Sequence, residues 1–63
     1  MNGGREINKF NRVDGIDDGL KIIYELKPYN KRSIRNGIKQ LYRYQEAALE
    51  KYKSLYRMVL VLY

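Results

Sequence analysis

Apolar and polar residues repeat with two different periods along this chain of 63 residues. Between residues 10 and 27, two short runs alternate with a period of two. The turn residues Asp17-Asp18-Gly19 separate the runs, and Pro28 closes the second. This alternation predicts two β-strands, and an Asp-Gly turn between them predicts a hairpin. We expect the more apolar face of the second strand to be covered; it is formed by Leu20, Ile22, Tyr24 and Leu26.

The stretch from Lys31 or Arg32 to Lys53 contains no proline and repeats its apolar residues with the period of an α-helix. Asn30 is a suitable N-cap. One arc of this helix is apolar and contains Ile34, Ile38, Leu41 and Ala48. Residues 56–63 then predict a third strand, apolar enough to be buried on both faces. A helix of this length between two strands predicts that they run parallel.

The predicted fold class is therefore α/β (α+β), with a small mixed sheet, one long helix and the order ββαβ over residues 10–63. Residues 1–9 are rich in glycine and asparagine and are expected to form a flexible lead-in. One helix leaves one face of the sheet bare, and a chain this short buries only ~60% of its unfolded surface. We therefore expect a homodimer or higher homo-oligomer.

The chain contains no Cys and no His. Disulfides, thiolate zinc sites, cysteine nucleophiles and Ser-His-Asp triads are thus excluded. Any chemistry has to use carboxylates, lysines, hydroxyls and a hard metal ion that binds oxygen. Thirteen Lys and Arg against seven Asp and Glu give a formal charge of +6, which favours a polyanionic partner such as nucleic acid.

The longest uncharged apolar run, residues 58–63, is far shorter than the ~20 residues of a membrane span. Residues 1–6 lack the apolar stretch of a signal peptide. We therefore expect a soluble, cytoplasmic protein with no membrane partner.

One group of residues has the chemistry of a metal-dependent hydrolase. In the predicted hairpin Asp14 lies across from Glu25 and Lys27, so two carboxylates and a lysine meet at one edge of the sheet. Two carboxylates can hold Mg²⁺, and the lysine can orient water or neutralise charge. Gln40 and Tyr44 lie four residues apart on one flank of the helix, which can meet this edge.

The residues Asp14, Glu25-x-Lys27 and Gln40-x-x-x-Tyr44 resemble the pattern of the PD-(D/E)xK nuclease superfamily. Residues 12–17 and 23–28 with the basic helix most resemble the restriction-endonuclease-fold domains of bacterial polymorphic toxins. The resemblance implies that Asp14 and Glu25 bind Mg²⁺ or Mn²⁺ and that Lys27 assists the attacking water. It implies that Gln40 and Tyr44 support the site or touch the substrate.

The same resemblance implies a nuclease that cuts DNA, with RNA as the second choice. If the chain is a toxin, it implies delivery into the cytoplasm of a target cell and an immunity protein as partner. Val13 stands where the family usually has proline. The family core also begins with a helix and a further strand, for which residues 1–9 leave little room. An abbreviated core is therefore expected, either as a remnant or as a protomer whose site is completed by a second chain.

Basic residues dominate the stretch from residue 27 to residue 43, which contains no acidic residue. Cations at the start of a helix oppose its dipole, so Lys31 and Arg32 suit phosphate binding better than stability. The predicted nucleic-acid-binding residues are Lys31, Arg32, Arg35, Lys39 and Arg43, although a solvated helix face explains the last three equally well.

Two carboxylates in the predicted hairpin turn have a simpler interpretation than metal binding. Asp17 and Asp18 are expected to form the turn, with Asp17 as a second choice for a metal ligand. For the whole chain the favoured hypothesis is an enzyme. The alternatives are a non-catalytic module that binds nucleic acid or protein, and a small basic oligomeric domain whose function lies outside this segment.

Overall fold

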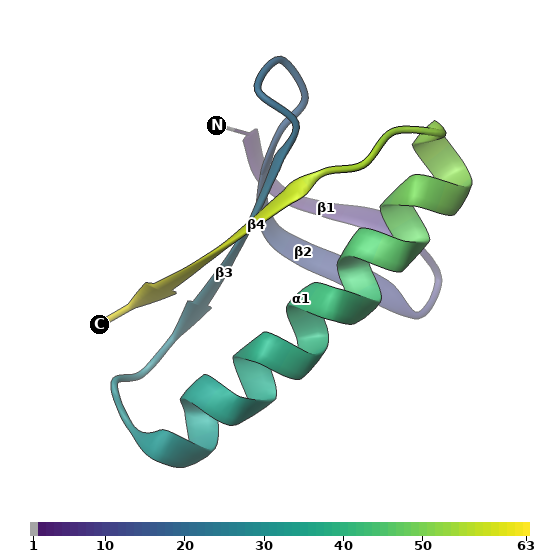
Figure 1. Ribbon diagram of the computed structural model, residues 1–63. Helices are drawn as coiled ribbons and strands as arrows, with labels where there is room; N and C mark the ends of the chain where they lie inside the picture. The colour runs from purple at the N-terminus through teal and green to yellow at the C-terminus, as the bar shows by residue number, and fades with distance from the viewer. Residues whose placement is uncertain (1) are drawn as a thin grey trace.

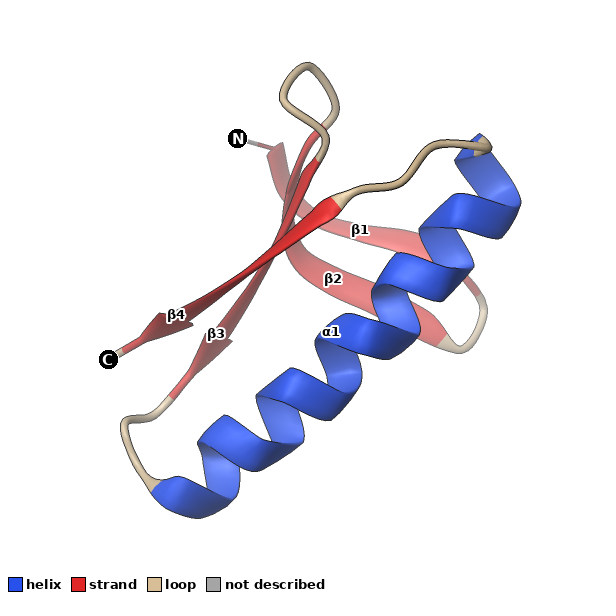
Figure 2. Cartoon of the chain, in the orientation of Figure 1, coloured by secondary structure: helices blue, strands red, loops and turns tan. Residues whose placement is uncertain are grey.

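The computed structural model describes residues 2–63, which form a sheet and one long helix (Figures 1 and 2). The elements are β1 (Asn2–Asn8), β2 (Asn11–Asp17), β3 (Ile22–Lys27), α1 (Lys31–Tyr52) and β4 (Arg57–Leu62). The sheet order is β1-β2-β3-β4; β1, β2 and β3 are antiparallel neighbours, and β4 runs parallel to β3. The predicted α+β class, hairpin, long helix and parallel crossover are confirmed.

Strand β1 corrects the prediction of a flexible lead-in over residues 1–9; Met1 lies outside the described residues. It pairs with β2 in a register that places Arg5 opposite Val13. Ile7 is 1% exposed, and Lys51 Nζ donates a hydrogen bond of 2.7 Å to its carbonyl oxygen. One buried apolar residue and a paired backbone are thus enough to order this segment. β1 is therefore a fourth strand of the sheet, which the sequence analysis did not predict.

Both ends of α1 have recognisable caps. Asn30 Oδ1 accepts a hydrogen bond of 2.8 Å from the Ser33 N–H, as predicted for an N-cap. At the other end Lys53 adopts a left-handed conformation with φ 57°, and its N–H bonds to the Leu49 carbonyl. Across residues 2–63, no helix has both the length and the apolar character needed to cross a membrane.

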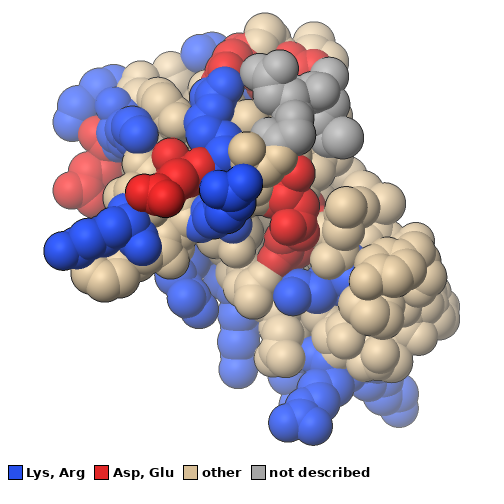
Figure 3. Space-filling view, turned by 180° about the vertical axis from the view of Figure 1, so that it is seen from behind, with Lys and Arg blue, Asp and Glu red and all other residues tan. Residues whose placement is uncertain are grey.

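The helix covers the face of β3 opposite to the one expected from its sequence. Ile23 is fully buried under α1, whereas Leu26 on the other face is 47% exposed. Alternation shows that a strand has two faces, but the path of the crossover decides which face the helix covers. β4 is likewise not buried on both faces, because Val59 and Val61 are each 37% exposed. Figure 3 shows this uncovered side of the sheet, with a large uncharged area where β3 and β4 lie.

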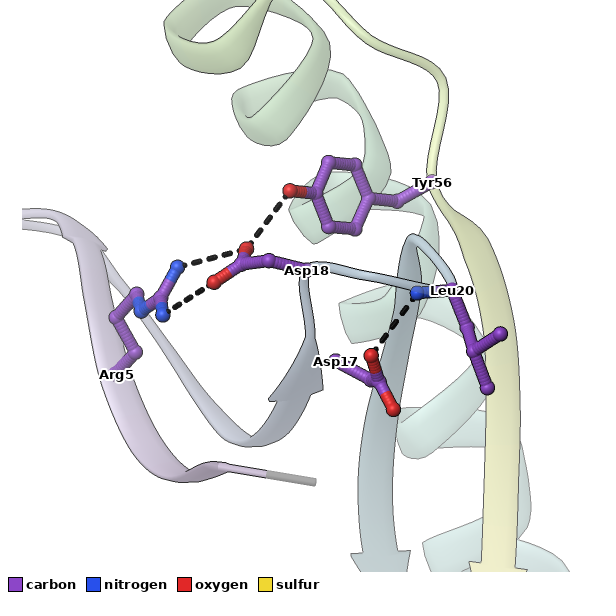
Figure 4. Close-up of polar contacts among 5 residues, drawn as sticks. All are labelled: Arg5, Asp17, Asp18, Leu20 and Tyr56. Atoms are coloured by element: carbon purple, nitrogen blue, oxygen red, sulfur yellow. Dashed lines mark hydrogen bonds and ion pairs between the residues drawn. The ribbon is translucent and has the colours of Figure 1, made fainter.

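A polar cluster joins β1, the β2–β3 turn and the segment before β4 (Figure 4). The Arg5 guanidinium donates hydrogen bonds of 2.9 and 2.6 Å to Asp18, and Tyr56 Oη donates one of 2.8 Å to the same carboxylate. These contacts lower the pKa of Asp18, with the Arg5 hydrogen bond as the main cause. Asp17 Oδ1 accepts a hydrogen bond from the Leu20 N–H and so stabilises the turn, as expected from the sequence.

Close approach of α1 to the sheet depends on Gly37. A Cβ placed there would lie 2.7 Å from Leu60 Cδ1 and 2.9 Å from Lys27 Cγ, both closer than ordinary packing allows. Gly37→Val should therefore lower the free energy of unfolding by ~1–3 kcal/mol, as overpacked sites do. Urea unfolding measures this loss. Asn36→Val on the exposed side of the helix is the control, and equal losses for the two variants would contradict the packing role.

Candidate active site

The candidate site lies where β2 and β3 stop pairing. Their register runs from Asp17 opposite Ile22 to Gly15 opposite Tyr24. Beyond this point the Leu26 N–H donates a hydrogen bond of 2.9 Å to Asp14 Oδ2. The Asp14 carboxylate thus takes the place of the next backbone hydrogen bond between the strands. This contact holds Asp14 against β3, although Asp14 remains exposed.

Glu25 is the buried member of a carboxyl pair with Asp14. It is 2% exposed, and burial is the main reason that its pKa rises to about 8, followed by the hydrogen bond to Asp14 and the charge of Asp14. The same hydrogen bond is the main reason that the pKa of Asp14 falls below its ordinary value. Near neutral pH a protonated Glu25 therefore donates to an ionised Asp14.

Lys27 lies beside this pair on the same face of β3. Its Nζ is 3.8 Å from Glu25 Oε2, which is an ion-pair distance but too long for a good hydrogen bond. The lysine opposes the rise in the pKa of Glu25, but burial and Asp14 outweigh it. Its stem packs next to Gly37, so the helix limits where the ammonium group can go.

The helix contributes Tyr44 to the same site. Tyr44 is 8% exposed, and its pKa is raised by burial first and then by the charges of Glu25 and Asp14. The phenol therefore lies within electrostatic reach of the carboxyl pair and keeps its proton at neutral pH. Gln40 is half-buried one helical turn earlier on the same flank. The structure thus brings together Asp14, Glu25, Lys27 and Tyr44, with Gln40 next to them along the helix.

The five predicted nucleic-acid-binding residues are all exposed on α1; they are Lys31, Arg32, Arg35, Lys39 and Arg43. The first turn of the helix contains no acidic residue. This turn follows β3 closely, so Lys31 and Arg32 lie near the Lys27 end of that strand. Arg43 differs from the others, because it lines a hollow together with Glu46 and Glu50.

Two features of the site were missed by the sequence interpretation. The Leu26 N–H that fixes Asp14 is a backbone group, which no pattern of side chains reveals. Gly37 sets the distance between the helix and Lys27. The only signal for this role is a glycine within an otherwise regular amphipathic helix.

The carboxyl pair has the donor set of a divalent-cation site. Asp14 and Glu25 are close enough to share one proton, and a cation held between them would take the place of that proton. Within residues 2–63, no cluster of three or more acidic, His or Cys side chains is present. Mg²⁺ or Mn²⁺ suits such a site, because Mg²⁺ binds through one or two carboxylates and takes its other ligands from water and phosphate oxygens.

Comparison with known proteins agrees with this fold. A model of the family described as restriction endonuclease fold toxin 9 matches residues 2–63. No curated protein and no solved structure matches the chain. The match includes all five elements of the structure, from β1 to β4. The chain therefore belongs to the restriction endonuclease fold toxin 9 family.

Proposed function

We propose that this chain is a toxin nuclease that uses Mg²⁺ or Mn²⁺ to hydrolyse phosphodiester bonds in DNA, with RNA as the alternative substrate. One observation carries the proposal: Asp14 and a buried Glu25 form a carboxyl pair, and Lys27 Nζ lies 3.8 Å from Glu25. Burying a carboxyl group is costly, and this one stands next to a second carboxyl, whose effect on its pKa Lys27 does not outweigh.

Asp14 and Glu25 would hold the cation, which supplies charge neutralisation and a Lewis acid for the phosphodiester. Lys27 carries a positive charge beside the pair and would stabilise negative charge on the phosphate as it is attacked. Tyr44 keeps its phenolic proton and can donate a hydrogen bond within the site. Gln40 would reach the substrate from the next helical turn.

The basic side chains of α1 would position the nucleic acid through its phosphates. Lys31 and Arg32 are the strongest candidates, because they combine with the N-terminus of the helix near the Lys27 end of β3. For a toxin that acts inside a target cell, we propose the cytoplasm of that cell as the site of action. We also propose an immunity protein as the neutralising partner and a homo-oligomer as the active form.

A cleavage assay tests the proposal directly. The purified chain is incubated with single- and double-stranded DNA and with RNA, in Mg²⁺, in Mn²⁺ and in EDTA. We expect cleavage that requires the metal, and Glu25→Gln, tested in parallel, should be inactive. Binding without cleavage under every condition would instead support the non-catalytic nucleic-acid-binding module. The absence of both binding and cleavage would overturn both interpretations.

Binding through Lys31 should be visible in the salt dependence of DNA affinity. Each phosphate contact releases counterions, so Lys31→Gln should reduce the slope of log K against log salt by about 1 for all sequences. Fluorescence anisotropy in EDTA measures this slope without cleavage. Lys9→Gln, which removes the same charge from the β1–β2 turn, is the control. Equal slopes for wild type and Lys31→Gln would favour a merely solvated helix face.

A further inference from the structure

The face of the sheet opposite α1 carries an apolar patch on β3 and β4. We call it the sheet patch, and it consists of Tyr24, Leu26, Val59, Val61 and Tyr63. Leu26 and Tyr63 are 47% and 75% exposed. In contrast, Met58 and Leu60 of β4 point to the helix side and pack on the core. In Figure 3 this region is the large uncharged area on the side of β3 and β4. Such a contiguous patch marks an interaction surface.

Two charged residues lie at opposite ends of the sheet patch. Arg57 shares the outward face of β4 with Val59 and Val61, and it stands opposite Ile22 at the start of β3. Asp14 lies near the other end, where it lines a hollow of about 350 Å³ with Leu26 and Val61. The patch therefore has a cation at one end, an anion at the other and only uncharged side chains between them.

We propose that a second copy of this chain covers the sheet patch, with the two sheets packed face to face about a two-fold axis. Neither nucleic acid nor an acidic partner suits this surface, because phosphates and carboxylates would lose water against apolar side chains. A second copy brings an identical apolar surface and buries no charge in the centre. An isologous contact of this kind closes on itself as a dimer.

The end charges select the orientation of the two copies. Strands that run antiparallel across the interface place Arg57 of one copy over the hollow at Asp14 of the other. Strands that run parallel place the two Arg57 side chains together, which like charges oppose. In the antiparallel arrangement the axis passes near Val59, which lies opposite Tyr24 in the middle of the patch.

The sheet patch would form the centre of a larger interface. A standard interface buries roughly 800 Å² on each partner, which is less than a fifth of the 4536 Å² exposed on this chain. Two tyrosines, two valines and a leucine, each partly exposed, supply the apolar centre of such a surface. We therefore expect a dimer that forms at micromolar concentration.

The proposed contact brings a residue of the second copy to the candidate active site. The partner copy's Arg57 would add a positive group beside Asp14, from the face of the sheet opposite Glu25 and Lys27. This part of the inference rests on the proposed nuclease function. The dimer itself does not, because it is measured in EDTA without nucleic acid.

Light scattering and cysteine cross-linking test the interface. The chain contains no Cys, so Val59→Cys is the only thiol in its variant. Two such thiols near the two-fold axis, on sheets ~10 Å apart, should be joined into a covalent dimer by a short bismaleimide reagent. Leu55→Cys is the control, because Leu55 is 65% exposed and lies outside the patch. Wild-type chain that stays a monomer at 100 μM, or equal cross-linking of both variants, would overturn the proposal.

Charge variants test the surface without relying on cross-linking. Val59→Asp should weaken the dimer at least ~100-fold, because it buries an unpaired charge at the interface, whereas Leu55→Asp should leave the affinity unchanged. Arg57→Asp should weaken it about tenfold, and Lys53→Asp, which changes the same charge away from the patch, should not. Circular dichroism checks that each variant is folded. A dimer that survives Val59→Asp would place the interface elsewhere.

Discussion

Asp14→Asn, Glu25→Gln and Lys27→Ala are each expected to lower the single-turnover cleavage rate by at least ~100-fold, the scale on which a catalytic group acts. The double variants should be less than tenfold slower than the slower single variant, because residues that act as one unit are strongly non-additive. The structural basis is their contact: the carboxyl groups of Asp14 and Glu25 are adjacent, and Lys27 Nζ lies 3.8 Å from Glu25 Oε2. Removing any one of the three residues should therefore abolish the catalytic contribution of the other two.

Two carboxylates elsewhere in the chain provide matched controls for this series. Glu50→Gln removes an exposed acid from α1 and should keep full activity. Asp17→Asn removes the second-choice metal ligand, while the asparagine oxygen can still accept the hydrogen bond from the Leu20 N–H. Activity that survives Glu25→Gln, or that disappears with Asp17→Asn, would show that the site has been placed on the wrong carboxylates.

The sequence predicts the type of each main element but not every contact that positions it. The helix is predictable because its period, its N-cap and the proline before it agree. β1 is not, because it contains a single large apolar residue, Ile7, and depends on pairing with β2 and on the Arg5–Asp18 ion pair. An ion pair between residues 13 positions apart leaves no local trace in the sequence.

The sequence also did not predict which face of α1 is buried. Ile38 belongs to the predicted apolar arc but is 45% exposed, whereas Gly37 and Tyr44 are buried. The helix is rotated toward its small residues, because Gly37 allows it to approach Leu60 and Lys27. This rotation also places Tyr44 near Glu25.

The proximity of Asp14 to Glu25 was predictable from the hairpin, because these residues lie next to Gly15 and Tyr24, the last paired positions of β2 and β3. Their burial was not. Alternation on β3 favours the Tyr24 and Leu26 face as the covered one, and only the structure shows that α1 covers Glu25. A buried carboxyl group breaks the ordinary rule for strand faces, and such departures are expected at functional sites.

Burial of Glu25 should make the stability of the metal-free protein decrease as the pH rises. Its pKa is about 8 in the folded state against 4.5 ordinarily, so the folded chain holds more protons than the unfolded chain between these values. Stability from this group is full below pH 4.5 and is lost by about pH 8, with a limiting slope of about 1.4 kcal/mol per pH unit. Between pH 5.5 and 8 in EDTA, we expect a loss of ~3 kcal/mol in the free energy of unfolding.

The composition of the chain leaves few other groups that titrate between pH 5.5 and 8. With no His and no Cys, the amino terminus is the other ordinary group that titrates near neutral pH. Asp14 and Asp18 have lowered pKa values, so their contributions are lost only at acidic pH below the window. Urea unfolding at a series of pH values in EDTA therefore reports mainly on Glu25.

Glu25→Gln separates this effect from any other pH dependence, because glutamine has the same shape and no titrating proton. Its stability should be flat from pH 5.5 to pH 8, whereas the exposed control Glu50→Gln should retain the wild-type slope. Adding Mn²⁺ at pH 8 should stabilise the wild type by ~2.7 kcal/mol at a hundred times the dissociation constant, and should leave Glu25→Gln nearly unchanged. A flat wild-type profile in EDTA would contradict the burial of this carboxyl group. A Mn²⁺ effect that persists in Glu25→Gln would contradict its role as a metal ligand.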